Sequence, residues 1–109
     1  MEVFEQEKDG KLVLRPSGRL DSTTSVAFGQ NLKIKAESGS SDIVIDFSDL
    51  EYISSAGLRT LLEAAKLLKA KEGNLSLCSL NSQVQEVFDI SGFSGIFSIH
   101  QNLEGACDT

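Results

Sequence analysis

The chain has 109 residues, of which 40% are hydrophobic and 24% are charged, a composition typical of a folded globular protein rather than a disordered one. A chain of this length can bury an ordinary core without help from disulfides or metals, so we expect a single domain over residues 1–109. The formal net charge of −6 and the lack of a basic cluster with interleaved aromatics argue against nucleic-acid binding.

The sequence also lacks membrane and secretion signals. No apolar run approaches the roughly 20 residues that span a bilayer, and the acidic beginning, Met1 to Glu5, does not resemble a signal peptide. We therefore expect no membrane insertion and a cytoplasmic location. Cys78 and Cys107 lack C-x-x-C spacing and are expected to be free thiols in that reducing compartment, with Cys78 buried as a small hydrophobe.

The first third of the chain predicts a hairpin and a helix. Two β-type runs, Val3–Glu7 and Lys11–Pro16, flank Asp9-Gly10, and a D-G dipeptide in this position is a strong hairpin signal. A helix is predicted from about Thr23 to Glu37, after several candidate N-cap residues at 21–24. Its apolar residues recur at close to the helical period and are Val26, Phe28, Leu32 and Ala36.

The middle of the chain predicts the central strand and the longest helix. Ile43–Phe47 is β-branched and almost continuously apolar, as expected for a strand that is covered on both faces. A polar corner follows, in which Asp46, Asp49 and Glu51 are interpreted as solvated. After Ser54 and Ser55, a clean helical stripe consists of Leu58, Leu61, Leu62, Ala65 and Leu68. Lys69, Lys71 and Gly73 are interpreted as a cationic last turn and a C-terminal stop.

The last third predicts shorter elements. Asn74–Ser79 reads as a strand, and a short helix follows that is capped at 81–82 and ends at Ser91-Gly92. Ile96–His100 is expected to be an edge strand, and Leu103–Ala106 could form a final helical turn. Because strands and helices alternate after the hairpin, the predicted fold class is α/β with a mainly parallel mixed sheet.

Two adjacent serines, Ser54 and Ser55, stand where a strand has ended and a helix begins. They could be N-cap residues and nothing more, or an exposed hydroxyl could be chemically useful there. Catalysis is not favoured: the single histidine, His100, is remote in sequence, and neither a G-x-S-x-G elbow nor a nucleotide-binding loop is present. No metal or cofactor ligand set is evident. The serines are more credible as substrates than as catalysts.

Three segments together resemble one known family. Residues 46–62 read D-F-S-D-L-E-Y-I-S-S-A-G-L-R-T-L-L and are similar to the signature of the bacterial anti-sigma factor antagonists, members of the STAS domain family. The resemblance extends to Gly18–Asp21, which is similar to the family's G-x-L-D, and to Val87–Phe93. It covers nearly the whole chain and implies a STAS-like fold.

The resemblance also implies a site. The family motif usually reads D-S-[ST]-G-L, so that Gly57 and Leu58 align with its last two residues and Ser55 is the implied phosphoacceptor. Ser54 then replaces the usual aspartate, and Ala56 replaces the second hydroxyl residue. The implied partner-binding residues are Asp21, Ser22, Ser54, Ala56, Gly57 and Arg59. Asp21 and Ser22 could instead only cap a helix, and Arg59 could instead pair with Glu63.

The implied function is a switch. By the resemblance, the unphosphorylated protein binds an anti-sigma factor that is itself a serine kinase and so frees a sigma factor for transcription. Phosphorylation of Ser55 releases that partner, and a separate phosphatase resets the protein. The alternative is a STAS subunit that docks on a membrane transport complex without being phosphorylated.

Overall fold

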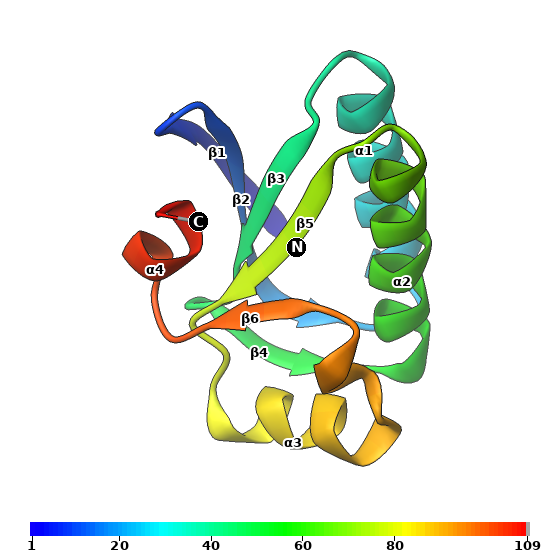
Figure 1. Cartoon of the computed structure of the whole chain (residues 1–109). Helices are drawn as coiled ribbons and strands as arrows, with labels where there is room; N and C mark the ends of the chain where they lie inside the picture. The colour runs from blue at the N-terminus through cyan, green and yellow to red at the C-terminus, as the bar shows by residue number, and fades with distance from the viewer. Residues whose placement is uncertain (109) are drawn as a thin grey trace.

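Strands and helices alternate along the chain after an N-terminal hairpin (Figure 1). The computed structural model describes residues 1–108. In chain order its elements are β1 (Glu2–Lys8), β2 (Lys11–Leu20), α1 (Thr24–Glu37), β3 (Asp42–Asp46), β4 (Leu50–Ile53), α2 (Ser55–Ala70), β5 (Asn74–Cys78), α3 (Ser82–Ser91), the 3-10 turn η1 (Phe93–Gly95), β6 (Ser98–His100) and α4 (Leu103–Cys107). The strand order is β1-β2-β3-β5-β6, with β4 paired to β2. Only β1 and β2 pair antiparallel among these residues, which confirms the mainly parallel mixed sheet.

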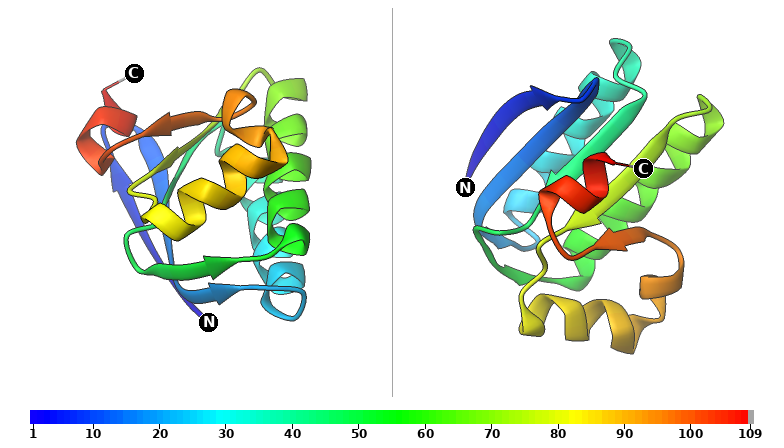
Figure 2. Two further views of the ribbon diagram at one scale, coloured as in Figure 1. Left: turned by 90° about the horizontal axis from the view of Figure 1, so that it is seen from below. Right: turned by 60° about the vertical axis from the view of Figure 1, so that its left-hand side comes forward.

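The two faces of the sheet are covered by different helices. α1 and α2 lie side by side on one face, and α4 lies on the other (Figures 1 and 2). In β3 the side chains of Ile43 and Ile45 belong to the larger core cluster, while Val44 between them belongs to a smaller cluster with Cys78 and Cys107. Successive side chains of a strand point to opposite faces. The prediction of a central strand that is covered on both faces is therefore confirmed.

The long strand β2 belongs to two pairings. Its first part, Leu12–Leu14, pairs with β3, and its last part, Gly18–Leu20, pairs with β4. The register shifts between Gly18 and Arg19, and Gly18 has a φ of 99°, a left-handed conformation that glycine adopts without strain. This irregularity bends β2 so that its end reaches β4. The sequence did not predict β4, because its polar exposed positions resemble a loop.

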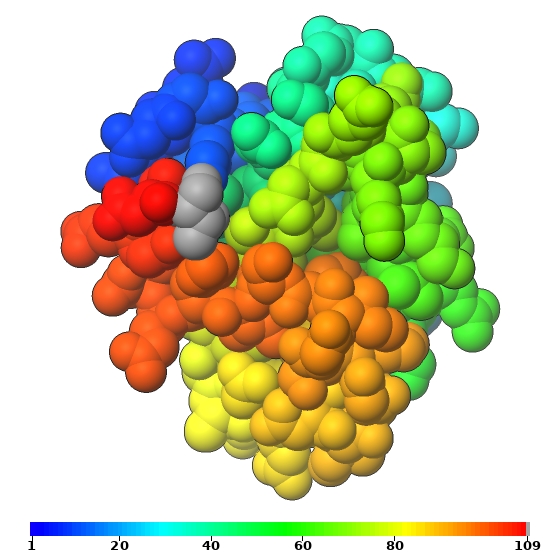
Figure 3. All heavy atoms as spheres, in the orientation of Figure 1, coloured from blue at the N-terminus to red at the C-terminus, as the bar shows by residue number. Residues whose placement is uncertain are grey.

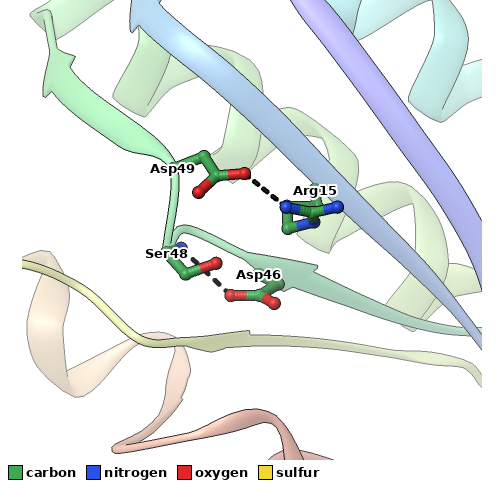
Figure 4. Close-up of polar contacts among 4 residues, drawn as sticks. All are labelled: Arg15, Asp46, Ser48 and Asp49. Carbon is green, nitrogen blue, oxygen red and sulfur yellow. Dashed lines mark hydrogen bonds and ion pairs between the residues drawn. The ribbon is translucent and has the colours of Figure 1, made fainter.

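A polar turn joins β3 to β4 (Figure 4). The Ser48 N–H donates to Asp46 Oδ1 at 3.0 Å, and Arg15 on β2 forms an ion pair with Asp49. Asp46 is only 8% exposed, so its interpretation as part of a solvated corner was wrong; the side chain is held against the strand end because it bonds the turn. Asp49 and Glu51 are exposed as expected. The turn fixes the path of the chain into β4.

Helix α1 was predicted in the right place, but its buried face differs. Val26 is 62% exposed, and Ser25 is buried in its place. Gly29 faces α2, where an added Cβ would lie 2.9 Å from Thr60 Cγ2. The helix therefore packs closely on α2, and a small residue at position 29 permits that approach.

The end of α2 also differs from the expected stop. The left-handed residue after the helix is Glu72, with a φ of 61°, rather than Gly73. Gly73 is needed for space: a Cβ there would lie 2.1 Å from the Ser41 carbonyl oxygen. The backbone of the α2–β5 connection thus packs against the segment that leads into β3.

The C-terminal elements match the prediction closely. Asn81 caps α3 by accepting from the Val84 N–H at 2.8 Å, and its amide donates to the Leu50 carbonyl at 2.9 Å, which ties α3 to β4. β6 lies at an edge of the sheet. The expected last turn is α4, which lies beside the N-terminal hairpin (Figure 3) and accepts a hydrogen bond from Lys11 at the Ala106 carbonyl. Thr109 lies outside the described residues.

Both thiols are buried where α4 meets the sheet. Desolvation, together with the nearby Asp46 carboxylate, raises the pKa of the Cys78 thiol to about 11, and burial also raises the pKa of Cys107. A raised pKa leaves little of the nucleophilic thiolate at neutral pH. These cysteines are therefore inert packing residues in the folded state.

We predict that iodoacetamide does not alkylate Cys78 in the native protein at pH 8, whereas both cysteines react in denaturant. Cys107 should react before Cys78, because a short terminal helix opens locally more readily than a central strand. Mass spectrometry of timed samples measures both rates. Alkylation of native Cys78 at the denatured rate would contradict this packing.

Candidate functional site

The ends of β2 and β4 lie together, and each leads into a helix. The Ser54 N–H donates to the Leu20 carbonyl at 2.9 Å, and Leu20 pairs with Ile53 in the register of the two strands. Asp21 directly follows Leu20, so the loop before α1 is brought next to the start of α2. Two of the predicted site segments, distant in sequence, therefore share one corner of the molecule.

Ser54 is the N-cap of α2. Its backbone is extended, with φ −96° and ψ 174°, and its hydroxyl accepts a hydrogen bond from the Gly57 N–H at 3.2 Å. Its carbonyl accepts from the Leu58 N–H at 2.9 Å, the first bond of the helix. A serine in this arrangement satisfies one of the free N–H groups at the helix start. The Ser54 side chain is thus engaged in capping.

Ser55 differs from its neighbour. It is the first residue of α2 and is exposed, and its hydroxyl has no hydrogen-bond partner within residues 1–108. Beside it is a hollow of about 230 Å³ between α2 and the segment that follows α3, lined by Ser55, Leu58, Arg59, Leu62, Ser91 and Phe93. The hydroxyl is therefore accessible at a helix N-terminus, where the backbone favours negative charge.

Gly57 and Ala56 lie in the same turn. A Cβ on Gly57 would stand 2.8 Å from the Leu20 carbonyl oxygen and 2.9 Å from Ile53 Cγ1, so only glycine allows this approach of α2 to β2 and β4. Ala56 is half-buried. The glycine of the motif thus has a packing role that its spacing alone did not reveal.

Asp21 caps the other helix at this corner. Its Oδ1 accepts from the Thr23 N–H at 2.9 Å and the Thr24 N–H at 3.1 Å. These hydrogen bonds lower the pKa of the Asp21 carboxyl, and the bond from the Thr24 N–H has the larger effect. The capping alternative is therefore correct for Asp21, although it does not prevent a second role, whereas Ser22 is exposed.

Charged and aromatic side chains surround the two helix starts. Arg59 is exposed, and its alternative pairing with Glu63 is not among the ion pairs of the described residues. The guanidinium of Arg19 lies over the Tyr52 ring at 4.2 Å from its centroid. Sequence reasoning did not select Tyr52 or Phe93 for this region. An aromatic residue two positions before the paired serines, in a corner otherwise interpreted as polar, was a signal that could have found Tyr52.

Other kinds of site find little support within residues 1–108. No described hydrogen bond joins His100 to either serine, and no group of three or more His, Cys, Asp or Glu side chains is placed to hold a metal ion. None of the helices in that part of the chain combines the length and apolarity that a membrane crossing requires.

Comparisons with known proteins agree with this fold and motif. Residues 4–106 match the STAS domain family. The chain is 38% identical over 106 residues to BtrV of Bordetella bronchiseptica, for which a role as an anti-sigma factor antagonist is proposed, covering 97% of this chain and 91% of BtrV. It is 29% identical to the anti-sigma-B factor antagonist of Bacillus subtilis, covering 96% and 94% of the two chains. A Thermotoga maritima crystal structure, assigned to the same class, superposes with a TM-score of 0.92 at 21% identity, over 97% of this chain and 92% of that one.

The chain therefore belongs to the STAS domain family. Other curated relatives that it matches over most of their length, among them those of Paenibacillus polymyxa and Bacillus subtilis, are anti-sigma factor antagonists. The fold and family that the sequence motifs predicted are confirmed.

The two adjacent serines give a stability prediction. Ser54→Ala should lower the free energy of unfolding by about 1 kcal/mol, because it removes the N-cap acceptor. Ser55→Ala, the matched control one residue away, should change it by no more than about 0.5 kcal/mol, because an exposed side chain without partners is lost. Urea unfolding measures both. Equal losses would show that the two hydroxyls share the capping role.

A second prediction concerns acid stability. Because the folded pKa of Asp21 lies below its usual value of 3.8, its charged form stabilises the native state above that pH, and this contribution is lost as pH falls through the folded pKa. Asp21→Asn keeps a capping oxygen without the charge. Wild type should be more stable than this variant at pH 7, and denaturant titrations at decreasing pH should show the difference begin to shrink near pH 3.8 and vanish only below the folded pKa. A difference that does not depend on pH would contradict the role of the charge.

Proposed function

We propose that the protein is an anti-sigma factor antagonist that binds a cognate anti-sigma factor and is switched off when that partner, acting as a serine kinase, phosphorylates Ser55. The binding face would consist of Asp21, Ser22, Ser54, Ala56 and Arg59, with the buried Gly57 contributing by holding the first turn of α2 in place. A separate phosphatase would restore the unmodified protein, and the output would be sigma-factor-dependent transcription. Membership of the STAS family and the roles of the curated relatives support this assignment.

One observation carries the proposal. The Ser54 hydroxyl is engaged by the Gly57 N–H, whereas the adjacent Ser55 hydroxyl is exposed and unbonded among the described residues. A phosphoacceptor has to enter the active site of a kinase with a free hydroxyl. Ser55 meets that requirement without disturbing the cap that starts α2.

The same position suits a binding switch. A phosphate adds roughly −1.5 to −2 charges at pH 7, and a helix N-terminus stabilises a negative group by about 0.3 to 2 kcal/mol, so the fold should tolerate it. Across an interface the charge and bulk act differently, because they meet groups that were packed against a neutral hydroxyl. A loss of about 2.8 kcal/mol there already weakens binding roughly a hundredfold.

The test is phosphorylation by purified anti-sigma factor kinases from the same genome. With ATP and its cognate kinase, the protein should gain the mass of one phosphate on Ser55. The folded fraction of the Ser54→Ala variant should still be phosphorylated, whereas the Ser55→Ala variant should not be. Intact-mass measurement and peptide mapping identify the site.

A mass gain that persists in Ser55→Ala would overturn the choice of serine. A protein that gains no phosphate, binds no anti-sigma factor and instead copurifies with a membrane transporter would favour the transport-complex alternative.

A further inference from the structure

A second hollow lies farther along α2, next to the one beside Ser55. It has a volume of about 510 Å³ and lies between α2, the start of β5 and residues 96–98. Leu62 lines both hollows, which therefore lie next to each other along α2 and are here together called the α2 groove. In the space-filling view, α2 (green) and the η1–β6 segment (orange) border this side of the molecule (Figure 3).

The floor of the α2 groove is apolar. Leu58, Leu62, Phe93, Ile96 and Phe97 contribute to it. Ile96 is 56% exposed, which is a large exposure for an isoleucine on a surface with other apolar side chains. An apolar, concave surface of this kind can bury the apolar side chains of a partner.

The charges along the α2 groove are of one sign. Arg59, Lys66 and Lys69 line it, and none of its lining residues is acidic. No described ion pair involves these three cations within residues 1–108. This is unexpected in a chain with sixteen acidic and ten basic side chains. The groove is therefore complementary to an occupant that is both apolar and anionic.

The length of the groove indicates the kind of occupant. From Ser55 to Lys69 α2 rises by about 21 Å, at roughly 1.5 Å per residue. That length corresponds to about four helical turns of a polypeptide. One end of the groove is Ser55 itself, which the proposed function places against the anti-sigma factor.

We infer that the α2 groove is a docking site for an acidic, amphipathic segment of the anti-sigma factor. The inference rests on the proposed function and extends its interface from the start of α2 to Lys69. Carboxylates of the segment pair with Lys66 and Lys69, and its apolar side chains cover Leu62 and Ile96.

This arrangement adds a reason for the effect of a phosphate on Ser55. The phosphate would place negative charge at one end of a groove that binds an acidic segment. Arg59 follows Ser55 by one helical turn, and residues at i and i+4 on a helix are neighbours. A phosphorylated Ser55 would therefore recruit Arg59 to itself and remove a cation from the groove.

The experiment compares two double variants with equal changes in charge. The groove variant, Lys66→Glu with Lys69→Glu, reverses the charge of two lysines that line the α2 groove. The control variant, Lys33→Glu with Lys71→Glu, reverses the charge of two exposed lysines that do not line it. Affinity of the full chain for the purified anti-sigma factor is measured by calorimetry. Thermal unfolding of each variant confirms that it is folded.

The groove variant should bind roughly tenfold more weakly or worse at low salt, and the control variant should remain within about threefold of wild type. The difference should shrink near 1 M salt, where the Debye length falls to about 3 Å. Equal affinities of the two variants, with wild type binding normally, would overturn the docking site but leave the proposed function intact.

Failure of wild type to bind any anti-sigma factor would instead remove the proposed function and this inference with it. A wild-type dimer that only the groove variant dissociates would assign the groove to a second copy of the chain and overturn the inference.

Discussion

The hydrogen bond from the Gly57 N–H to the Ser54 hydroxyl fixes where α2 begins, and the rest of the site depends on it. It is reinforced by the Ser54 N–H, which bonds the Leu20 carbonyl, and by the missing side chain of Gly57, which lets the first turn of α2 lie against β2 and β4. With the start of α2 set in this way, its apolar stripe falls on the core and the next residue, Ser55, points to solvent. The hydroxyl of Ser54 therefore caps the helix, and that of Ser55 is left exposed.

The charge distribution connects this corner to the whole of α2. The protein is acidic, yet the exposed side of α2 from Ser55 to Lys69 borders an apolar groove with three cations and no acid. A neutral hydroxyl at the end of such a surface is compatible with an acidic partner, and a phosphate is not. The same phosphate is favourable inside the protein, because it lies at a helix N-terminus. A phosphate on Ser55 would therefore change binding and leave the fold intact.

The sequence predicted the elements whose apolar residues recur with a clear period or whose ends carry a clear turn or capping signal. The stripe of α2, the apolar run of β3 and the D-G hairpin all depend on local signals, and each is confirmed. β4 was missed because its four residues show no alternation of apolar and polar side chains, and because its partner, the end of β2, is distant in sequence. Asp46 was predicted to be exposed and is buried, and Val26 was predicted to be buried and is exposed. Neighbours distant in sequence decide the burial of both side chains. The motif alignment already implied Ser55 rather than Ser54 as the phosphoacceptor, and the hydrogen bond from the Gly57 N–H to the Ser54 hydroxyl adds a physical difference between the two.

The central claim is that charge added at Ser55 weakens partner binding while the fold is retained. It is tested most directly by titrating the anti-sigma factor with homogeneous protein that carries phosphoserine at position 55, beside the unmodified protein and a sample with phosphoserine at position 54. We predict a roughly hundredfold weaker affinity for the position-55 form, with an unfolding midpoint close to that of the unmodified protein. The position-54 form should also stay folded, because its phosphate oxygens can accept from the N–H groups at the start of α2. Unchanged affinity of the position-55 form, or a loss that merely follows its unfolding, would contradict the account.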